Sequence, residues 1–226
     1  MMRLKTILSP FIFTLGLLVL GQPVQAQLLE QATKSRDVAM LFHKMSETDI
    51  DYDVWAMNSQ EYATAVDERK ESVLDEERLN VQMAYAELDP KNTDIVIRTQ
   101  ITTKVEEGKK TGLVLDFAVD GPLFFPYTYL EENYALIAQN IDLLKFIPLG
   151  KLEATYIKNK ISSQGKTFMV LKVRPHKVDT KEQTQIYDKN FWMMLGRVAS
   201  IHLYNKELET LWSWTADWYI SELDGE

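Results

Sequence analysis

The spacing of apolar residues changes near residue 90, and this change divides the chain into two predicted parts. Over residues 27–90 the apolar positions recur with the spacing of a helix, which predicts one helix within 28–45 and a longer one over 59–88. Asn58 lies where a capping residue would begin the longer helix. Charged residues interrupt its apolar stripe, so we expect a break near residues 72–75.

From residue 93 the apolar positions alternate with polar ones, as they do in a half-buried strand. The alternation runs over 93–105, stops at a polar stretch that contains Gly108 and Gly112, and resumes over 113–119. Two alternating runs joined by a polar segment with glycine predict a β-hairpin. The apolar residues that share one face of its first strand are Ile95, Ile97, Ile101 and Val105.

The middle and the end of the chain contain both kinds of spacing. Apolar residues separated by four and three positions predict a helix over 130–144. Residues 150–161 fit either a helix or a strand, and we favour the helix. Strands are predicted at 167–173 and 197–204, and residues 211–220 are expected to pair back as a final hairpin.

These elements predict an α+β fold, with N-terminal helices packed on a mainly antiparallel β-sheet built from hairpins. Residues 27–90 form the helical part, and residues 91–226 form the sheet with one or two inserted helices. We expect the two parts to make one continuous unit, because about 200 residues suit a single domain.

Residues 1–26 have the order of a secretory signal peptide. Arg3 and Lys5 precede an apolar run over 7–20, and Pro23 and the small residue Ala26 follow it. The alternative is an uncleaved anchor, but the run falls short of the roughly 20 apolar residues that a spanning helix needs. The mature protein is therefore expected to be periplasmic or secreted, with no transmembrane segment after cleavage.

The charge and the absence of cysteine exclude several classes of function. The net charge is −8, and removal of Arg3 and Lys5 with the leader brings it to −10. Such an acidic surface repels phosphate backbones, so nucleic acid is not an expected partner. Without cysteine the protein has no disulfide, thiol nucleophile or cysteine-bound zinc.

One acidic segment has the spacing of metal ligands. Asp49, Asp51 and Asp53 occupy alternate positions, as acids do in a calcium-binding loop. The rest of that loop is missing, because Val54 and Gln60 stand where glycine and a bidentate glutamate are required. We therefore expect no metal here and interpret the segment as an acidic connector between two helices.

No catalytic residue or cofactor is assigned. The three histidines, His43, His176 and His202, belong to no motif and are expected to be structural. The chain also has no nucleophile elbow and no glycine-rich phosphate loop.

Three tryptophans near the end are the one candidate binding surface. On a strand, Trp212, Trp214 and Trp218 would share one face and offer a stacking platform for a glycan or another envelope protein. The alternative is that the indoles fill the core, which we favour because large aromatic residues are usually buried.

Short apolar motifs in the sheet region resemble those of a family of exported bacterial proteins of unknown function. The motifs are Leu115-Asp116-Phe117, Phe124-Phe125-Pro126, residues 149–154 and residues 199–204, within a likeness that covers about Tyr62 to Leu211. The resemblance implies a bacterial envelope setting and one continuous domain, and it implies no activity.

The sequence as a whole predicts an exported, soluble, non-enzymatic interaction or accessory protein of the bacterial cell envelope. The alternative is an exported hydrolase of glycan or peptidoglycan, because two carboxylates that meet only in the fold suffice for that chemistry.

Overall fold

The computed structural model describes residues 32–117, 123–161 and 165–224, so the signal peptide predicted for residues 1–26 lies outside the described residues. The helices are α1 (Ser35–Met45), α2 (Tyr52–Met57), α3 (Gln60–Thr64), η2 (Asp67–Arg69), α4 (Lys70–Glu87), η3 (Ile141–Leu144), α5 (Lys151–Lys160) and α6 (Asp217–Asp224). The strands are β1 (Ile95–Glu106), β2 (Gly112–Asp116), β3 (Phe124–Tyr129), β4 (Glu132–Gln139), β5 (Phe146–Pro148), β6 (Lys166–Val178), β7 (Thr184–Ile186), β8 (Lys189–Tyr204) and β9 (Thr210–Thr215).

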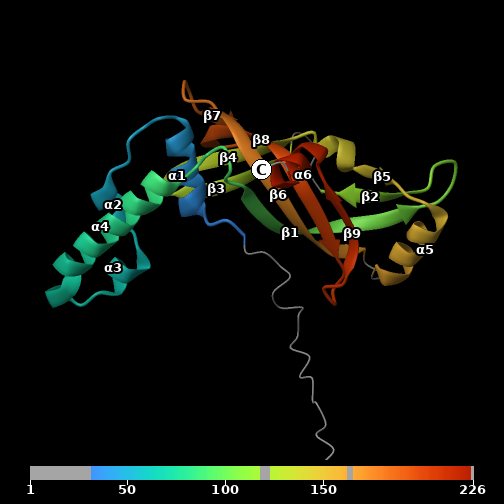
Figure 1. Cartoon of the computed structure of the whole chain (residues 1–226), viewed down its shortest axis with the longest axis horizontal. Coiled ribbons are helices and arrows are strands. Elements are labelled where there is room, and N and C mark those ends of the chain that lie inside the picture. The colour runs from blue at the N-terminus through green and yellow to red at the C-terminus, as the bar shows by residue number, and fades with distance from the viewer. Residues whose placement is uncertain (1–31, 118–122, 162–164, 225–226) are drawn as a thin grey trace, which may run out of the picture.

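The strands form one curled, mixed sheet that is mostly antiparallel (Figure 1). Its order is β3-β4-β8-β6-β1-β2-β5, and β7 and β9 also pair with β8. Among the described pairings only that of β4 with β8 is parallel. Helices together with such a sheet confirm the predicted α+β class.

The N-terminal helices divide into two groups. Val38, Leu41 and Phe42 of α1 are buried in the same core as the inner face of the sheet. In contrast, α2, α3 and α4 pack mainly on one another and extend beyond the end of the sheet (Figure 1). Their contact with the sheet includes Trp55 of α2, whose ring centroid is 4.6 Å from that of Tyr129 of β3. The expected packing of N-terminal helices on the sheet is therefore not confirmed for this second group, which we call the helical lobe.

The predicted boundaries within the helical lobe are wrong in two places. Ser59, and not Asn58, caps α3, because its side-chain oxygen accepts a hydrogen bond from the Tyr62 N–H at 3.1 Å. The break in the long helix falls at 65–69 rather than 72–75, where Val66 adopts an extended conformation. The short helix α2 was not predicted.

The hairpin predicted from the alternating pattern is confirmed. Strands β1 and β2 pair in antiparallel register, with Thr103 opposite Leu115. Ile97 and Ile101 are buried on the core side of β1, whereas Arg98 between them is exposed on the other side. The core that covers the inner face therefore follows directly from the period-two pattern.

The helix predicted over 130–144 is wrong, because residues 132–139 form β4. The loop that joins β3 to β4 consists of Leu130 and Glu131, both with positive φ (48° and 65°). A two-residue hairpin turn needs this left-handed backbone, which Asn and Gly adopt most readily. Strand β4 lies between β3 and β8 and is buried over 134–136, so its apolar run shows no clear alternation.

The end of the chain differs from the expected final hairpin. Residues 151–160 form helix α5, as favoured. Strand β9 pairs with β8 but ends at Thr215, and α6 begins at Asp217. The prediction of a strand that continues to residue 220 is therefore wrong.

One edge of β8 is shared by two strands, and this arrangement creates a gap in the sheet. Strand β6 pairs with β8 along residues 194–204 and occupies one edge. On the other edge, β4 pairs with residues 192–197 and β9 pairs with residues 200–204. Between the end of β4 and the end of β9, neither strand pairs with β8 at residues 198–199.

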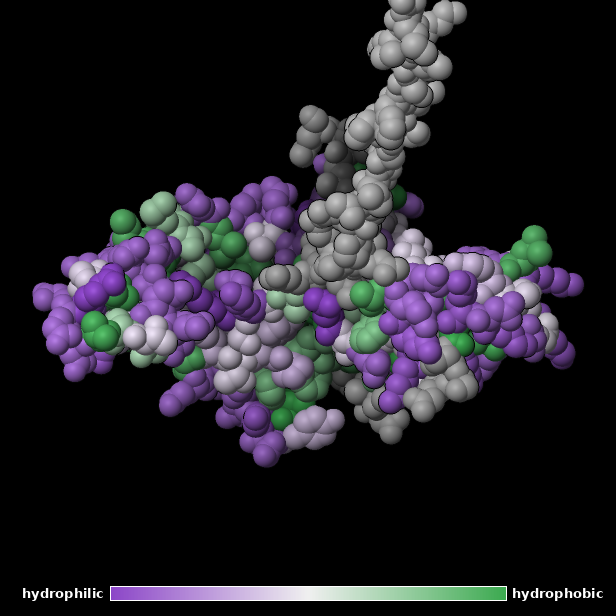
Figure 2. All heavy atoms as spheres, turned by 90° about the horizontal axis from the view of Figure 1, so that it is seen from below, coloured by the Kyte–Doolittle hydropathy of each residue, from purple (hydrophilic) through white to green (hydrophobic). Residues whose placement is uncertain are grey.

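The described helices include none long and apolar enough to cross a membrane. Seen from below, the helical lobe is mostly hydrophilic, with hydrophobic residues in small separate patches (Figure 2).

Candidate functional site

A cavity of about 510 Å³ opens at the gap between β4 and β9. Four segments line it: the end of β4 with η3, residues 197–198 of β8, the end of β9, and the first turn of α6. Most of its lining is apolar and comes from Leu143, Leu144, Val198, Trp214, Ala216 and Trp218. We call it the tryptophan cavity.

The two tryptophans reach this cavity from different elements. Trp214 lies near the end of β9, opposite Ile201 of β8, and is half-buried against the core. The Ala216 N–H then donates a hydrogen bond to the Ala199 carbonyl at 2.8 Å, and α6 begins at the next residue. This turn places Trp218 in the first turn of α6, beside the same cavity.

The structure therefore brings together two of the three predicted tryptophans. Trp212 lies on β9 opposite Leu203, packs against the core, and is not part of the cavity lining. Trp218 lies on α6 and not on the strand, so the three indoles do not share one strand face. A binding role for these tryptophans stays a prediction.

Two arginines lie against the ring of Trp218. Arg174 of β6 and Arg197 of β8 are direct neighbours across the two strands. The guanidinium carbon of Arg197 is 5.2 Å from the Trp218 ring centroid, and that of Arg174 is 5.6 Å from it. These distances are within the range of cation–π contacts.

A second hollow of about 300 Å³ adjoins the tryptophan cavity, because Arg197 and Trp218 line both. Its other polar lining residues are Lys91, Arg174, His176 and Glu222. We call it the arginine hollow. Arg197 and Trp218 thus border both a largely apolar cavity and a hollow with several cationic groups.

An ion-pair network holds α6 on the sheet. The Asp94 carboxylate accepts hydrogen bonds from Arg174 Nε at 2.8 Å and from the Tyr219 hydroxyl at 2.7 Å. Arg174 also pairs with Glu222 of α6. Because Asp94 precedes β1 while Tyr219 and Glu222 belong to α6, this network fixes the helix that carries Trp218. We call it the α6 clasp.

The pKa of His176 reflects the electrostatic environment of the arginine hollow. Burial lowers the pKa of His176 below its ordinary value of 6.5, and the neighbouring cations Arg197 and Lys177 lower it further. A positive potential at the imidazole disfavours its protonated form. Burial and the two neighbouring cations therefore both act against a positive charge on His176.

The acidic segment serves local structure. Asp51 caps α2, because its carboxylate accepts hydrogen bonds from the N–H groups of Asp53 and Val54. Asp53 pairs with Arg78 of α4, and Asp49 is exposed. Among the described residues no group of three histidine or acidic side chains is arranged to hold a metal ion.

The three histidines lie in separate surroundings. His43 of α1 is 3.3 Å from the Tyr134 hydroxyl and 2.9 Å from Thr48 Oγ1. Burial lowers the pKa of His43, although Glu132 opposes this shift. Burial also raises the pKa of Tyr134 to about 12. His202 stacks on Tyr204, with ring centroids 6.4 Å apart.

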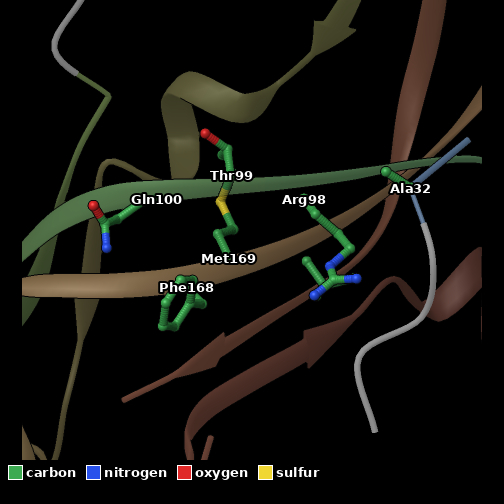
Figure 3. Close-up of a pocket in the computed structure, with 7 residues that line it drawn as sticks. Ala32, Arg98, Thr99, Gln100, Phe168 and Met169 are labelled. Atoms are coloured by element: carbon green, nitrogen blue, oxygen red, sulfur yellow. The ribbon is translucent and has the colours of Figure 1, made fainter. Parts of the chain in front are cut away.

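A further hollow of about 390 Å³ lies on β1 and β6 and includes Ala32. Figure 3 shows Arg98 and Phe168 on one side of these strands and Thr99 and Met169 on the other. Its lining has one aromatic ring, that of Phe168, and one guanidinium, that of Arg98. The tryptophan cavity combines two indoles with an arginine in cation–π contact and is the stronger candidate.

Comparison of the chain with protein-family models, with curated proteins and with solved structures finds no match. The resemblance to an exported bacterial family therefore stays a prediction.

Sequence reasoning did not identify Arg174 and Arg197. The available signal was weak: Arg197 is a single cation within an apolar strand region, and Arg174 is one of several basic residues near the end of its strand, together with Lys172 and Lys177. Only the register of β6 with β8 makes them neighbours.

Proposed function

We propose that this protein is a non-enzymatic, exported binding protein of the bacterial cell envelope that holds a small amphipathic molecule in the tryptophan cavity. The observation that carries the proposal is the cavity itself, with two indoles and four aliphatic residues in its lining and Arg197 at its border. The order of residues 1–26 supports the extracytoplasmic setting.

The size and lining of the cavity suit a small ligand. Ligand cavities commonly measure about 300–1,000 Å³ and combine apolar walls with a few polar groups that set orientation. The tryptophan cavity has a volume of about 510 Å³, and its polar lining consists of Gln139, Asn140, Arg197 and Asp217. An apolar chain can pack on Leu143 and Trp214 while a polar end faces Arg197 or Asp217.

The position of the cavity also favours binding. Leu143 of η3 is 76% exposed although it lines the cavity, so an apolar ligand would cover a side chain that the protein leaves in water. Burial of such surface stabilises a complex by about 25 cal/mol per Å² before the costs of association.

A neutral brominated chain tests capture in this cavity, because bromine quenches indole fluorescence on contact. We expect 10-bromodecan-1-ol to quench part of the tryptophan emission of the mature protein in a saturable manner. The Trp214→Phe and Trp218→Phe variants should each lose part of that quenching. The matched control is Trp212→Phe, which changes the same residue type on the same strand outside the cavity and should keep it.

Two results would contradict the proposal. One is the absence of saturable quenching, and the other is equal quenching in the Trp214→Phe variant and the wild type. Export is tested separately by the mass of the protein released from the periplasm, which should correspond to residues 27–226.

A further inference from the structure

Of the two neighbouring arginines, Arg174 belongs to the α6 clasp and Arg197 does not. Arg174 binds Asp94 at 2.8 Å and also pairs with Glu222. Among the described residues no ion pair joins Arg197 to a carboxylate, and its side chain is exposed. Arg197 is therefore positioned by Trp218 but keeps its hydrogen-bond donors.

We infer that the tryptophan cavity binds an amphipathic carboxylate, with its apolar chain against Trp214 and Leu143 and its carboxylate on Arg197. This inference rests on the proposed function, because it names the head group of the ligand of that same cavity.

The contact with Trp218 positions Arg197 to bind an oxyanion. The guanidinium carbon lies 5.2 Å over the Trp218 ring, a cation–π contact that holds the side chain at the border of the cavity. The N–H donors of a guanidinium lie in its plane, and two of them match the two oxygens of a carboxylate. A side chain held in this way loses less conformational entropy when it binds its ligand.

The surrounding charges favour one negative charge on the ligand. Arg174 is balanced by Asp94 and Glu222, which leaves Arg197 as the nearest cation to the cavity without an acidic partner among the described residues. One available guanidinium matches a carboxylate better than a phosphate monoester with two negative charges. The lowered pKa of His176, caused by burial and then by Arg197 and Lys177, supports a positive potential at this place.

One acidic group opposes the inference. Asp217 lines the cavity in the first turn of α6 and is exposed. A ligand with a cationic head would use Asp217 in place of Arg197. A carboxylate instead benefits from the N-terminal end of α6, where backbone N–H groups favour negative charge. The charge of the head group that binds more tightly therefore shows whether Arg197 or Asp217 contacts the ligand.

Three probes with the same chain and different heads test the inference on the mature protein. They are 10-bromodecanoate, 10-bromodecan-1-ol and 10-bromodecylamine, and saturable tryptophan quenching measures the dissociation constant of each. We expect the carboxylate to bind about tenfold more tightly than the alcohol, as charge-assisted hydrogen bonds imply. The amine should bind no better than the alcohol.

Variants of the arginine assign the preference to its side chain. Arg197→Gln should bind the carboxylate and the alcohol equally. Arg197→Lys keeps the positive charge but lacks the planar pair of guanidinium N–H donors, so it should retain part of the preference for the carboxylate. Arg98→Gln is the matched control, because it removes another exposed arginine of the sheet outside the cavity. Near-ultraviolet circular dichroism shows whether each variant is folded, and Arg197→Lys keeps the test valid if Arg197→Gln is not.

The possible results separate the two proposals. If wild type binds the carboxylate and the alcohol equally, the head-group inference is overturned while capture in the cavity stands. A preference for the amine also overturns it and assigns the site to Asp217. If no probe quenches in a saturable manner, the proposed function and this inference both fail.

Discussion

The α6 clasp should contribute strongly to stability, and Asp94→Asn is the change that tests it. Asparagine has nearly the same shape as aspartate, so the substitution removes the charge and leaves the packing in place. The Asp94 carboxylate would no longer balance Arg174 or accept a charge-assisted hydrogen bond from the Tyr219 hydroxyl.

The magnitude follows from the burial of the pair. Both side chains of the Asp94–Arg174 pair are only 14% exposed. Removal of one partner from a buried pair costs about 3–5 kcal/mol, because the other charge stays buried without compensation. Glu222 still pairs with Arg174 and reduces this cost. We therefore expect Asp94→Asn to lower the free energy of unfolding by about 2–3 kcal/mol.

Equilibrium urea denaturation measures the effect, and an exposed ion pair provides the control. Glu107 also pairs with Lys158 at 2.8 Å, but these side chains are 53% and 56% exposed. Glu107→Gln should cost less than about 1 kcal/mol, as exposed pairs do. If Asp94→Asn costs no more than Glu107→Gln, the argument that burial makes the α6 clasp strong is refuted.

Two further predictions concern the N-terminal half. The pKa of His43 in the folded protein is lowered from 6.5 mainly by burial. As the pH falls, the unfolded chain therefore binds the proton before the folded protein does. The contribution of His43 to the free energy of unfolding is complete above pH 6.5 and is lost as the pH falls through the lower pKa of the folded state. His43→Gln should reduce the slope of unfolding free energy against pH between about pH 7 and about pH 5, and an unchanged slope would contradict this. Asp51→Ala should cost about 1 kcal/mol as a lost helix cap, equally with and without calcium in thermal denaturation. Calcium-dependent stabilisation of the wild type alone would instead indicate a metal site.

Elements with a strict local period could be predicted, and those buried on two sides could not. The β1–β2 hairpin has one face in the core and one in water. The alternation of apolar and polar residues, as at Ile97, Arg98 and Thr99, therefore predicts which side chains are buried. Strand β4 lies inside the sheet between β3 and β8, and its residues 134–136 are all buried. A run that is apolar on both faces has no period that separates a strand from a helix.

The turn before β4 also gave no sequence signal for the strand. Leu130 and Glu131 adopt the left-handed conformation that the turn requires. Neither residue type is a usual signal for such a turn, because the left-handed backbone is sterically less favourable for Leu and Glu than for Gly and Asn. Pairing of β3 and β4 on either side of the turn holds this backbone in place, and pairing is a property of the fold.

The α+β class, the absence of cysteine chemistry and the acidic charge follow from the sequence alone, because each depends on composition or on neighbours along the chain. The leader of residues 1–26 stays a prediction. The sequence also indicated Trp214 and Trp218 as candidates, although Trp218 lies on α6 and not on the predicted strand. That these two indoles line one cavity beside Arg197, at a gap in the sheet, could be seen only in the folded protein. This arrangement depends on which edge of β8 is taken by β4, β6 and β9, and strand pairing between distant segments leaves no periodic signal in the sequence.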